Sequence, residues 1–326
     1  MADLEPTSPL QRGKWGHVMP YLFLLPAAII IVTFRLLPIL SALAVSFFDA
    51  SFGKIRGFVG LDQYAKLFAD PEFWNSAVNT VWFVVGAVPL SVATSLFFAL
   101  LLRKGIRGLG LYRTIYFLPV VTSFVAVSMV WKLIFHVRFG LANALIEKMG
   151  GNPLEWLEEP TGIFELMLRP LGWDLPTWAE GPSLALICVV IVSVWRGIGY
   201  NVVIFLAGLQ NIPEHYYEAA RIDGAGRAGM FRHVTWPLLT PTTFYVVVMT
   251  TILSFQVFAP IYLMTGPPVG GPLGTTNVIV YYLFEKGFDA GGNMGYASAV
   301  ALVLFAVILV LTLFQRKVVE KRVHYA

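Results

Sequence analysis

Long apolar runs alternate with shorter polar stretches along most of the chain. A helix needs about 20 apolar residues to cross the hydrocarbon layer of a membrane. Six runs are long enough, and they cover residues 18–48, 76–102, 114–135, 184–208, 238–264 and 295–314. No run has the two-residue alternation that is typical of outer-membrane barrel strands. The pattern therefore predicts an all-α membrane protein whose six transmembrane helices form one domain over residues 18–316.

The composition agrees with this prediction. Apolar residues make up 57% of the chain and charged residues 13%, whereas a soluble domain has about 25% charged residues. The single cysteine, Cys188, lies in the fourth apolar run, so the chain has no intrachain disulfide and no cysteine-based metal site. We therefore expect an integral membrane protein that is surrounded by membrane lipid.

Basic residues are unevenly divided between the two sides of the predicted spans. One side holds 13 Lys and Arg residues against six acids, in segments 1–17, 103–113, 209–237 and 316–326. The other side holds seven Lys and Arg residues against 13 acids, in segments 49–75, 136–183 and 265–294. Because cytoplasmic loops carry the excess of positive charge, the N-terminal segment 1–17, the loop 213–237 and the tail 317–326 are expected in the cytoplasm.

The sequence lacks the motifs that would make this chain an enzyme. It contains no G-x-x-x-x-G-K-[ST], no G-x-S-x-G and no H-E-x-x-H. No carboxylate falls in a predicted span, so a proton or sodium relay of the usual Asp/Glu kind is excluded. We expect no catalytic residue, metal site or cofactor on this chain. If the chain transports a solute against its concentration gradient, another polypeptide must supply the energy.

The loop 213–237 is polar, although apolar runs flank it on both sides. Pro213 precedes a predicted helix over residues 214–222, and Gly224 follows it, as expected for a helix that ends in a tight turn. A second helical piece over residues 228–234 leads to Pro237, which can open the fifth span. The pattern predicts a helix–turn–helix at the cytoplasmic face, where small residues allow another surface to approach closely.

The segment "EAARIDGAGRAGMFRHVTWP" resembles the cytoplasmic EAA loop of permease subunits in binding-protein-dependent ABC importers. That motif is E-A-A, three residues, G, nine residues and then I-x-L-P. The spacing is kept without a gap, and the two departures, Val234 and Trp236, are still apolar. Four further stretches, at 58–80, 117–119, 194–220 and 255–268, resemble the carbohydrate-uptake branch of this family.

The resemblance implies a type I ABC importer-like permease fold in the inner membrane of a prokaryote. It implies that Glu218, Ala219, Ala220 and Gly224 dock a cytoplasmic ATPase dimer, which binds ATP and Mg²⁺. The other implied partners are a second homologous permease, so that a heterodimer forms, and an extracytoplasmic solute-binding protein. Nucleic acid is not an expected partner. The transported solute would be a sugar or a sugar-like molecule.

Two spans carry side chains that could line a sugar path. Phe255, Phe258 and Tyr262 recur on one face of the fifth predicted span, with Gln256 beside them. On the fourth span, Trp195 and Asn201 offer a similar mixture of aromatic and amide groups. Helix packing is the alternative explanation for the aromatic stripe, and an Asn deep in a span is expected to hydrogen-bond across helices or face water.

Arg196 lies near the middle of the fourth predicted span. A charge there is expensive, which makes this residue a functional candidate. With no acid in any span, its partners are backbone carbonyls, polar side chains, solute or a neighbouring subunit. A role in the path and a structural role at a subunit interface therefore both stay open.

Several alternatives remain at this level. The same machinery would suit glycerol 3-phosphate, a polyol or an oligosaccharide. A stand-alone channel or a membrane enzyme is a more distant alternative, because a channel needs no ATPase dock and an enzyme needs catalytic motifs. The outer loop 136–183 is longer than the compact family pattern by about 20 residues, and it is expected to form short helices on the outer face.

Overall fold

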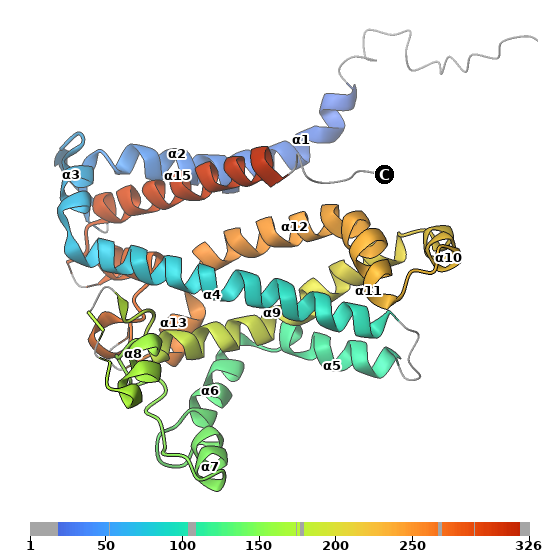
Figure 1. Ribbon diagram of the computed structural model, residues 1–326. Coiled ribbons are helices and arrows are strands. Elements are labelled where there is room, and N and C mark those ends of the chain that lie inside the picture. The colour runs from blue at the N-terminus through green and yellow to red at the C-terminus, as the bar shows by residue number, and fades with distance from the viewer. Residues whose placement is uncertain are drawn as a thin grey trace, which may run out of the picture. The chain divides into compact units, whose positions relative to one another are not determined.

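The computed structural model describes residues 19–51, 53–103, 109–173, 175–176, 179–266, 269–289 and 291–319 (Figure 1). The predicted cytoplasmic segment 1–17 and residues 320–326 of the predicted tail lie outside the described residues. So do Lys104 and Arg107, which contribute to the predicted orientation, and residues 267–268 at the end of the last family-like stretch.

Helices make up most of the described residues. The longer ones are α1 (Met19–Ile31), α4 (Pro71–Leu102), α5 (Leu109–Val121), α6 (Phe124–Ile134), α9 (Leu184–Gln210), α12 (Trp236–Phe255) and α15 (Met294–Val319), and the short α2 (Leu37–Val45) continues α1 after a π-helical turn. The shorter ones are α3 (Asp62–Ala69), α7 (Leu141–Lys148), α8 (Ile163–Leu168), α10 (Glu214–Ile222), α11 (Arg227–Met230), α13 (Ala259–Met264) and α14 (Ile279–Phe288). The predicted helical class is confirmed, with one addition: a two-stranded antiparallel hairpin of β1 (Phe48–Ser51) and β2 (Lys54–Phe58).

Five helical segments of the described chain are long and apolar enough to cross a membrane. They are Met19–Val45, Pro71–Leu102, Leu184–Gln210, Arg227–Phe255 and Met294–Lys317. Each overlaps one of the predicted apolar runs. The first and fourth contain π-helical turns, at Val32–Leu36 and Phe231–Thr235. The second helical piece that was predicted over residues 228–234 is therefore continuous with the fifth span, because α11, this turn and α12 follow one another directly.

The third predicted span, 114–135, is wrong as a single helix. α5 and α6 are separated by two residues, and their axes differ by 97°. Pro119 lacks the N–H that would continue the helical ladder. Thr122 Oγ1 donates a 2.7 Å hydrogen bond to the Leu118 carbonyl, and such back-bonds bend helices. The two pieces make a sixth span only when the bent pair is taken together.

The fifth predicted span, 238–264, is wrong in its second half. α12 ends at Phe255, and α13 starts at Ala259 after three non-helical residues. Pro260 lies in the first turn of α13, where its missing N–H is tolerated. The break falls among the residues that were predicted to form one aromatic stripe.

The chain divides into two compact units, which are residues up to 66 with 286–302, and residues 67–285 with those from 303 onwards. In the first unit, Asp49 of β1 accepts a 3.0 Å hydrogen bond from Asn293 Nδ2, and its carboxylate lies 3.8 Å from Arg56. The Ser46 and Tyr64 hydroxyls lie 2.8 Å apart. The Asn293 bond joins the hairpin to the residue before α15, and the Ser46–Tyr64 contact joins the end of α2 to α3.

In the second unit, α4, α5, α9 and α12 lie side by side (Figure 1). α9 is the central helix, because its side chains enter three separate hydrophobic clusters, through Phe205, Val190 and Val192. Figure 1 shows α10 at one end of this helix group and α8 and α13 at the opposite end. The long apolar helices therefore separate α10 from α8 and α13.

Asn143 organises the outer loop, where the expected short helices are α7 and α8. Its Nδ2 donates to the carbonyls of Val137 (2.8 Å) and Leu154 (2.9 Å). Its Oδ1 accepts from the Leu154 N–H (3.0 Å) and from Trp156 Nε1 (2.8 Å). The side chain is only 2% exposed, so these hydrogen bonds close the loop in an environment that is largely shielded from water.

Replacing Asn143 by alanine is expected to destabilise this loop by about 2 kcal/mol, because buried donors and acceptors lose their partners. The measurement is the rate of limited proteolysis within residues 137–160 of the detergent-solubilised protein. Asn152→Ala is the matched control, since Asn152 is exposed in the same loop. Equal cleavage rates for both variants would show that Asn143 does not organise the loop.

Candidate functional site

α10 has the bounds that the sequence predicted, and a complete set of capping hydrogen bonds ends it. The Gly224 N–H donates to the Arg221 carbonyl at 3.0 Å, and the Ala225 N–H donates to the Ala220 carbonyl at 2.9 Å. This pair of bonds is a Schellman motif, which requires a left-handed residue after the helix. Gly224 supplies it with φ 76°. The prediction that Gly224 shapes this turn is confirmed.

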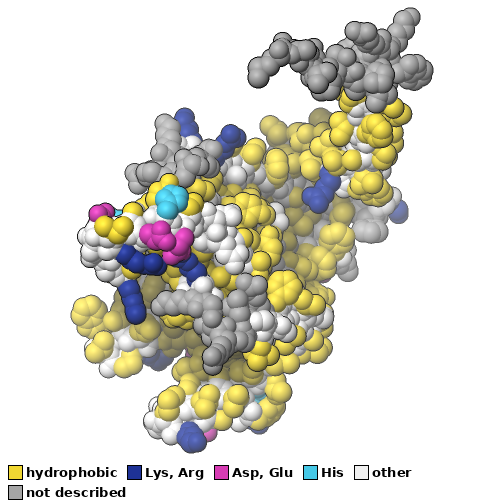
Figure 2. All heavy atoms as spheres, turned by 90° about the vertical axis from the view of Figure 1, so that its right-hand side faces the viewer, with side chains coloured by type: hydrophobic (Ala, Val, Ile, Leu, Met, Phe, Trp, Pro, Cys, Tyr) yellow, Lys and Arg dark blue, Asp and Glu magenta, His cyan; other side chains and the backbone are white. Residues whose placement is uncertain are grey.

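The outward face of α10 is unoccupied by other parts of the described chain. Glu218 and Ala219 are exposed, and Ile222 at the last position is 86% exposed. Within the described residues, no ion pair is formed by Glu218. Figure 2, viewed from the side on which α10 lies, shows acidic, basic and histidine side chains gathered together. This face therefore carries both charged and apolar side chains.

The inward face of α10 is fastened to two long helices. Tyr217 is 4% exposed, and its hydroxyl lies 3.0 Å from Thr235 Oγ1 at the base of α12. The guanidinium of Arg103, which follows α4, lies 4.1 Å from the centre of the Tyr217 ring. Glu214 adds an ion pair with Arg103 (4.0 Å), and a second one with Arg221 (3.1 Å) lies within α10 itself. A displacement of α10 would therefore pull on both α4 and α12.

The sequence did not single out this fastening or the exposed Ile222. Tyr217 and Thr235 carry no motif of their own, and Arg103 was part of a basic loop that orientation alone explained. One sequence feature could have identified Ile222 as an exposed apolar residue: it stands at the end of an otherwise polar helix.

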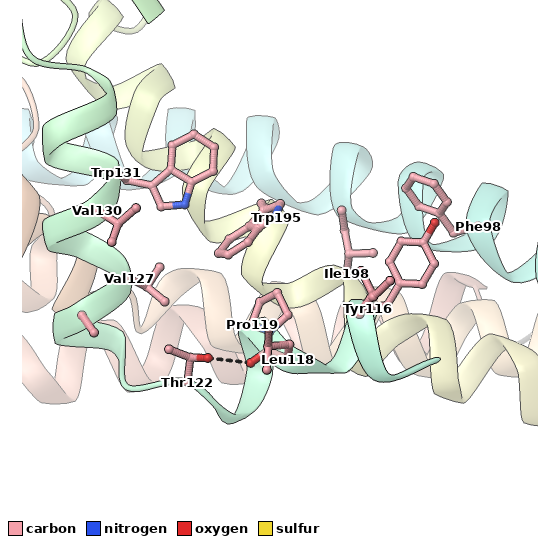
Figure 3. A pocket seen from close by; sticks show the side chains of 12 residues that line it. Phe98, Tyr116, Leu118, Pro119, Thr122, Val127, Val130, Trp131, Trp195 and Ile198 are labelled. Carbon is pink, nitrogen blue, oxygen red and sulfur yellow. Dashed lines mark hydrogen bonds between the residues drawn. The ribbon is translucent and has the colours of Figure 1, made fainter. Parts of the chain in front are cut away.

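A cavity of ≈590 Å³ lies in the elbow between α5 and α6. Figure 3 shows Trp131 and Trp195 towards one end and Phe98 and Tyr116 towards the other. The two tryptophan rings meet edge to face, with centroids 5.5 Å apart. The lining is almost wholly apolar, apart from a few polar tips such as Thr122. Trp195 is thus the predicted path residue that reaches this cavity.

Arg196 follows Trp195 and points its guanidinium at Phe124, the first residue of α6. The carbon of the guanidinium lies 4.7 Å from the ring centre. Its Nε is buried and has no hydrogen-bond partner within the described residues. The free-energy cost of burying the Arg196 charge in the span is therefore lowered by a cation–π contact with Phe124, and not by an ion pair with a carboxylate.

Asn201 joins three helices and does not enter the elbow cavity. Its Nδ2 donates to Ser91 Oγ of α4 at 3.0 Å and to Thr250 Oγ1 of α12 at 3.4 Å. The residue is 6% exposed. The expected hydrogen bond across helices is confirmed, and this use of the amide favours a structural tie over a place in the path.

The aromatic stripe predicted on the fifth span is not one helical face. Phe255 ends α12 and is 8% exposed, whereas Gln256 is exposed at the break. Phe258 and Tyr262 lie beyond the break and stack, with ring centroids 5.4 Å apart, and the Phe284 ring lies tilted against Phe258 with centroids 5.1 Å apart. The broken helix divides these four residues between a core position, a turn and a separate aromatic cluster.

Residues 91–325 match the family described as binding-protein-dependent transport system inner membrane component. The chain belongs to this family, whose members are permease subunits of ABC importers and work with a separate ATPase. It is a multi-pass membrane transport component, as the sequence predicted, and not an enzyme.

Individual relatives match over nearly their whole length. The probable ABC transporter permease protein YesP of Bacillus subtilis is 35% identical over 307 residues, which are 94% of this chain and 91% of YesP. The sn-glycerol-3-phosphate permease UgpA of Agrobacterium fabrum is 33% identical and covers 95% of this chain and 97% of its own. The lactose permease LacF of Rhizobium radiobacter is also 33% identical, with shares of 95% and 96%. The predicted carbohydrate-uptake branch is supported.

The fold also matches a solved structure. A bacterial ABC transporter that imports the acidic polysaccharide alginate aligns with a TM-score of 0.76 at 22% identity. The alignment covers 94% of this chain and 96% of that one. The predicted type I importer permease fold is thereby confirmed. A second structure shows the alginate transporter in complex with a periplasmic protein that holds an alginate pentasaccharide, with a TM-score of 0.76.

Proposed function

We propose that α10 is the coupling helix through which this permease receives the work of ATP hydrolysis. Glu218, Ala219, Ala220 and Gly224 form the contact with the partner ATPase, and Ile222 adds an apolar anchor. The observation that carries the proposal is a capped helix with an unoccupied outward face and an inward face fastened to α4 and α12. A helix that only covered the membrane surface would need no such fastening.

The partner ATPase binds ATP and Mg²⁺, and its closure moves α10. Because Tyr217 contacts Arg103 and Thr235, this movement reaches the ends of α4 and α12. The long helices then alternate between inward-facing and outward-facing arrangements. In this scheme α10 and both termini lie in the cytoplasm, and the loop with α7 and α8 lies outside the membrane.

The complete importer contains a second, homologous permease, so the two permeases form a heterodimer around the path. An ATPase dimer lies on the cytoplasmic side, and a solute-binding protein docks on the outer loops. The complex of the alginate transporter with its periplasmic protein supports this last partner by fold analogy.

The solute is a sugar or a sugar-like molecule. The relatives named for lactose and sn-glycerol 3-phosphate support this class. So does the aromatic wall of Trp131 and Trp195, since flat rings pack against the C–H faces of sugars. Polyols and oligosaccharides fit the same machinery. Within the predicted path we keep Trp195 and Arg196, and we place Phe258 and Tyr262 in a separate aromatic cluster.

Charge reversal at Glu218 tests the coupling proposal. Glu218→Lys is expected to lower the amount of ATPase that co-purifies with the tagged permease at least about tenfold, because an interfacial charge pair becomes a repulsive contact. The control is Glu147→Lys, which reverses an exposed acid on α7 in the outer loop. Undiminished capture of the ATPase by Glu218→Lys would overturn the proposal, provided that Glu147→Lys also captures it normally.

A further inference from the structure

Trp236 stands where the EAA pattern has a leucine, and it takes no part in the proposed coupling contact. The residue begins α12, and its side chain is 42% exposed. Its indole N–H donates to no acceptor within the described residues. Tryptophan combines a large apolar ring with one donor, and it is enriched where a membrane helix leaves the hydrocarbon layer. An exposed indole here therefore indicates contact with the membrane interface.

The π-helical turn Phe231–Thr235 brings a second aromatic side chain beside Trp236. Residues five apart in an α-helix point about 140° away from each other, since each residue turns by about 100°. In the π turn the hydrogen bonds join residues five apart, and the Trp236 N–H donates to the Phe231 carbonyl. The two ring centroids lie 6.3 Å apart, and Phe231 is 37% exposed. The turn thus forms an exposed aromatic pair from rings that a regular helix would separate.

Two arginines lie next to this aromatic pair on the same helical segment. Arg227 precedes Phe231 by four residues, and Arg232 precedes Trp236 by four, so each arginine shares a helical face with one of the rings. Both arginines are exposed, and neither forms an ion pair within the described residues. Residues 224–284 contain no Asp or Glu. The positive charge is therefore not neutralised by an acid of the same segment.

The aromatic pair lies at the start of a membrane span. The segment Arg227–Phe255 is long and apolar enough to cross a membrane, and α11 lies at the same end of the helix group as α10 (Figure 1). Figure 2, viewed from that side, shows basic side chains next to hydrophobic ones. In the proposed orientation this end is cytoplasmic. The cytoplasmic leaflet contains anionic lipids that attract basic residues, and the planar fork of arginine fits the oxygens of a phosphate.

We propose that the two arginines and the aromatic pair form a binding site for an anionic phospholipid of the cytoplasmic leaflet. The residues of this site are Arg227, Phe231, Arg232 and Trp236. The arginines hold the phosphate, the indole N–H donates to a glycerol or ester oxygen, and both rings lie against the upper part of the acyl chains. The proposal rests on the proposed function, which places α10 and this turn in the cytoplasm. The site adjoins the coupling contact, because Thr235 in the same turn lies 3.0 Å from the Tyr217 hydroxyl of α10.

The test records lipid contact at Trp236 itself. The complete importer is reconstituted in phosphatidylcholine vesicles that contain increasing mole fractions of phosphatidylglycerol with brominated acyl chains, because bromine quenches the fluorescence of a tryptophan that it contacts. Subtracting the signal of Trp236→Phe leaves the quenching of Trp236, since the other tryptophans are common to both proteins. Half-maximal quenching is expected at a several-fold lower mole fraction of brominated phosphatidylglycerol than of brominated phosphatidylcholine. Equal curves for the two lipids would overturn the proposal.

Substitutions of the basic residues then locate the headgroup. Arg232→Gln is expected to raise the mole fraction of phosphatidylglycerol at half-maximal quenching about fivefold, because one phosphate contact is lost. Arg232→Lys should retain most of the preference, since its charge remains. Lys317→Gln is the matched control, because it removes an exposed positive charge from the end of α15 and should leave the curve unchanged. An equal shift in Lys317→Gln would show that the lipid responds only to the net charge of this membrane face, and the site would be wrong.

Capture of the ATPase separates this proposal from the coupling proposal. Arg232→Gln is expected to capture the ATPase in detergent as well as the wild type does. Lost capture would mean that Arg232 contacts the ATPase, and the lipid site would be wrong. If Glu218→Lys captures the ATPase normally while phosphatidylglycerol still quenches Trp236 selectively, the coupling proposal fails and the lipid site stands.

Discussion

Replacing Tyr217 by alanine is expected to lower solute uptake by about 100-fold while the ATPase still binds and hydrolyses ATP. The Tyr217 ring is buried and contacts Arg103 on one side, and its hydroxyl contacts Thr235 on the other. Loss of a buried aromatic side chain costs about 3 kcal/mol. That free energy corresponds to about a 100-fold change in the equilibrium between α10 packed against α4 and α12 and α10 detached from them.

The outward face of α10 is left intact by this change. Glu218, Ala219 and Ile222 keep their places, so the ATPase retains its dock. The remaining contact between α10 and the end of α4 is the Glu214–Arg103 ion pair, and exposed ion pairs stabilise by at most about 1 kcal/mol. Movement of α10 would then no longer be transmitted to α4 and α12.

The measurement is the ratio of solute imported to ATP hydrolysed in proteoliposomes that contain the whole complex. Tyr216→Ala is the matched control, because the adjacent Tyr216 is 41% exposed and contributes no such fastening. Tyr217→Phe should give an intermediate ratio, since the ring under Arg103 remains. A ratio that stays constant in Tyr217→Ala, even with slower transport, would show that Tyr217 does not transmit movement.

The sequence predicted α10 well because local rules define it. Pro213 before the helix and Gly224 after it fix both ends within a few residues, and no distant contact is needed. The structure has the same bounds, Glu214–Ile222, and the left-handed φ of 76° at Gly224. The family resemblance added a partner to this helix, which no local rule contains.

The helix breaks could not be predicted because proline alone does not decide them. Pro89 lies inside α4, which continues to Leu102, whereas Pro119 is followed by the elbow before α6. In a membrane, neighbouring helices and hydroxyl side chains satisfy the backbone groups that proline leaves free. Whether they do so depends on tertiary contacts, and the length and hydrophobicity of one apolar run do not predict those contacts.

The contacts that hold α10 against α4 and α12 could not be predicted, for a related reason. Arg103, Tyr217 and Thr235 come from three parts of the chain, and none of them is unusual in its own segment. The Asn201 side chain is the contrasting example. Its depth in an apolar run was enough to predict a hydrogen bond between helices, although the partners Ser91 and Thr250 emerged only from the fold.

Replacing Gly199 by alanine is expected to destabilise the folded permease by about 3 kcal/mol, because it overpacks a helix contact. A Cβ at Gly199 would overlap the backbone carbonyl oxygen of Tyr116, and Val120 Cγ2 would lie 3.1 Å away. Small residues permit such close approach between membrane helices. Since the obstacle is backbone, the strain can be relieved only if α5 moves away from α9.

Gly197→Ala separates this clash from any general effect of removing a glycine from α9. A Cβ at Gly197 would meet only Ser91 Oγ, at an ordinary 3.7 Å. Alanine favours a helix over glycine by about 1 kcal/mol, so this control is expected to be unchanged or more stable. Thermal unfolding in detergent measures both variants. Equal midpoints would show that α5 does not depend on Gly199. A lower midpoint for Gly199→Ala alone would show that the close approach of α5 and α9 is needed to form the elbow cavity, because Tyr116 and Pro119 on α5 form part of the cavity wall.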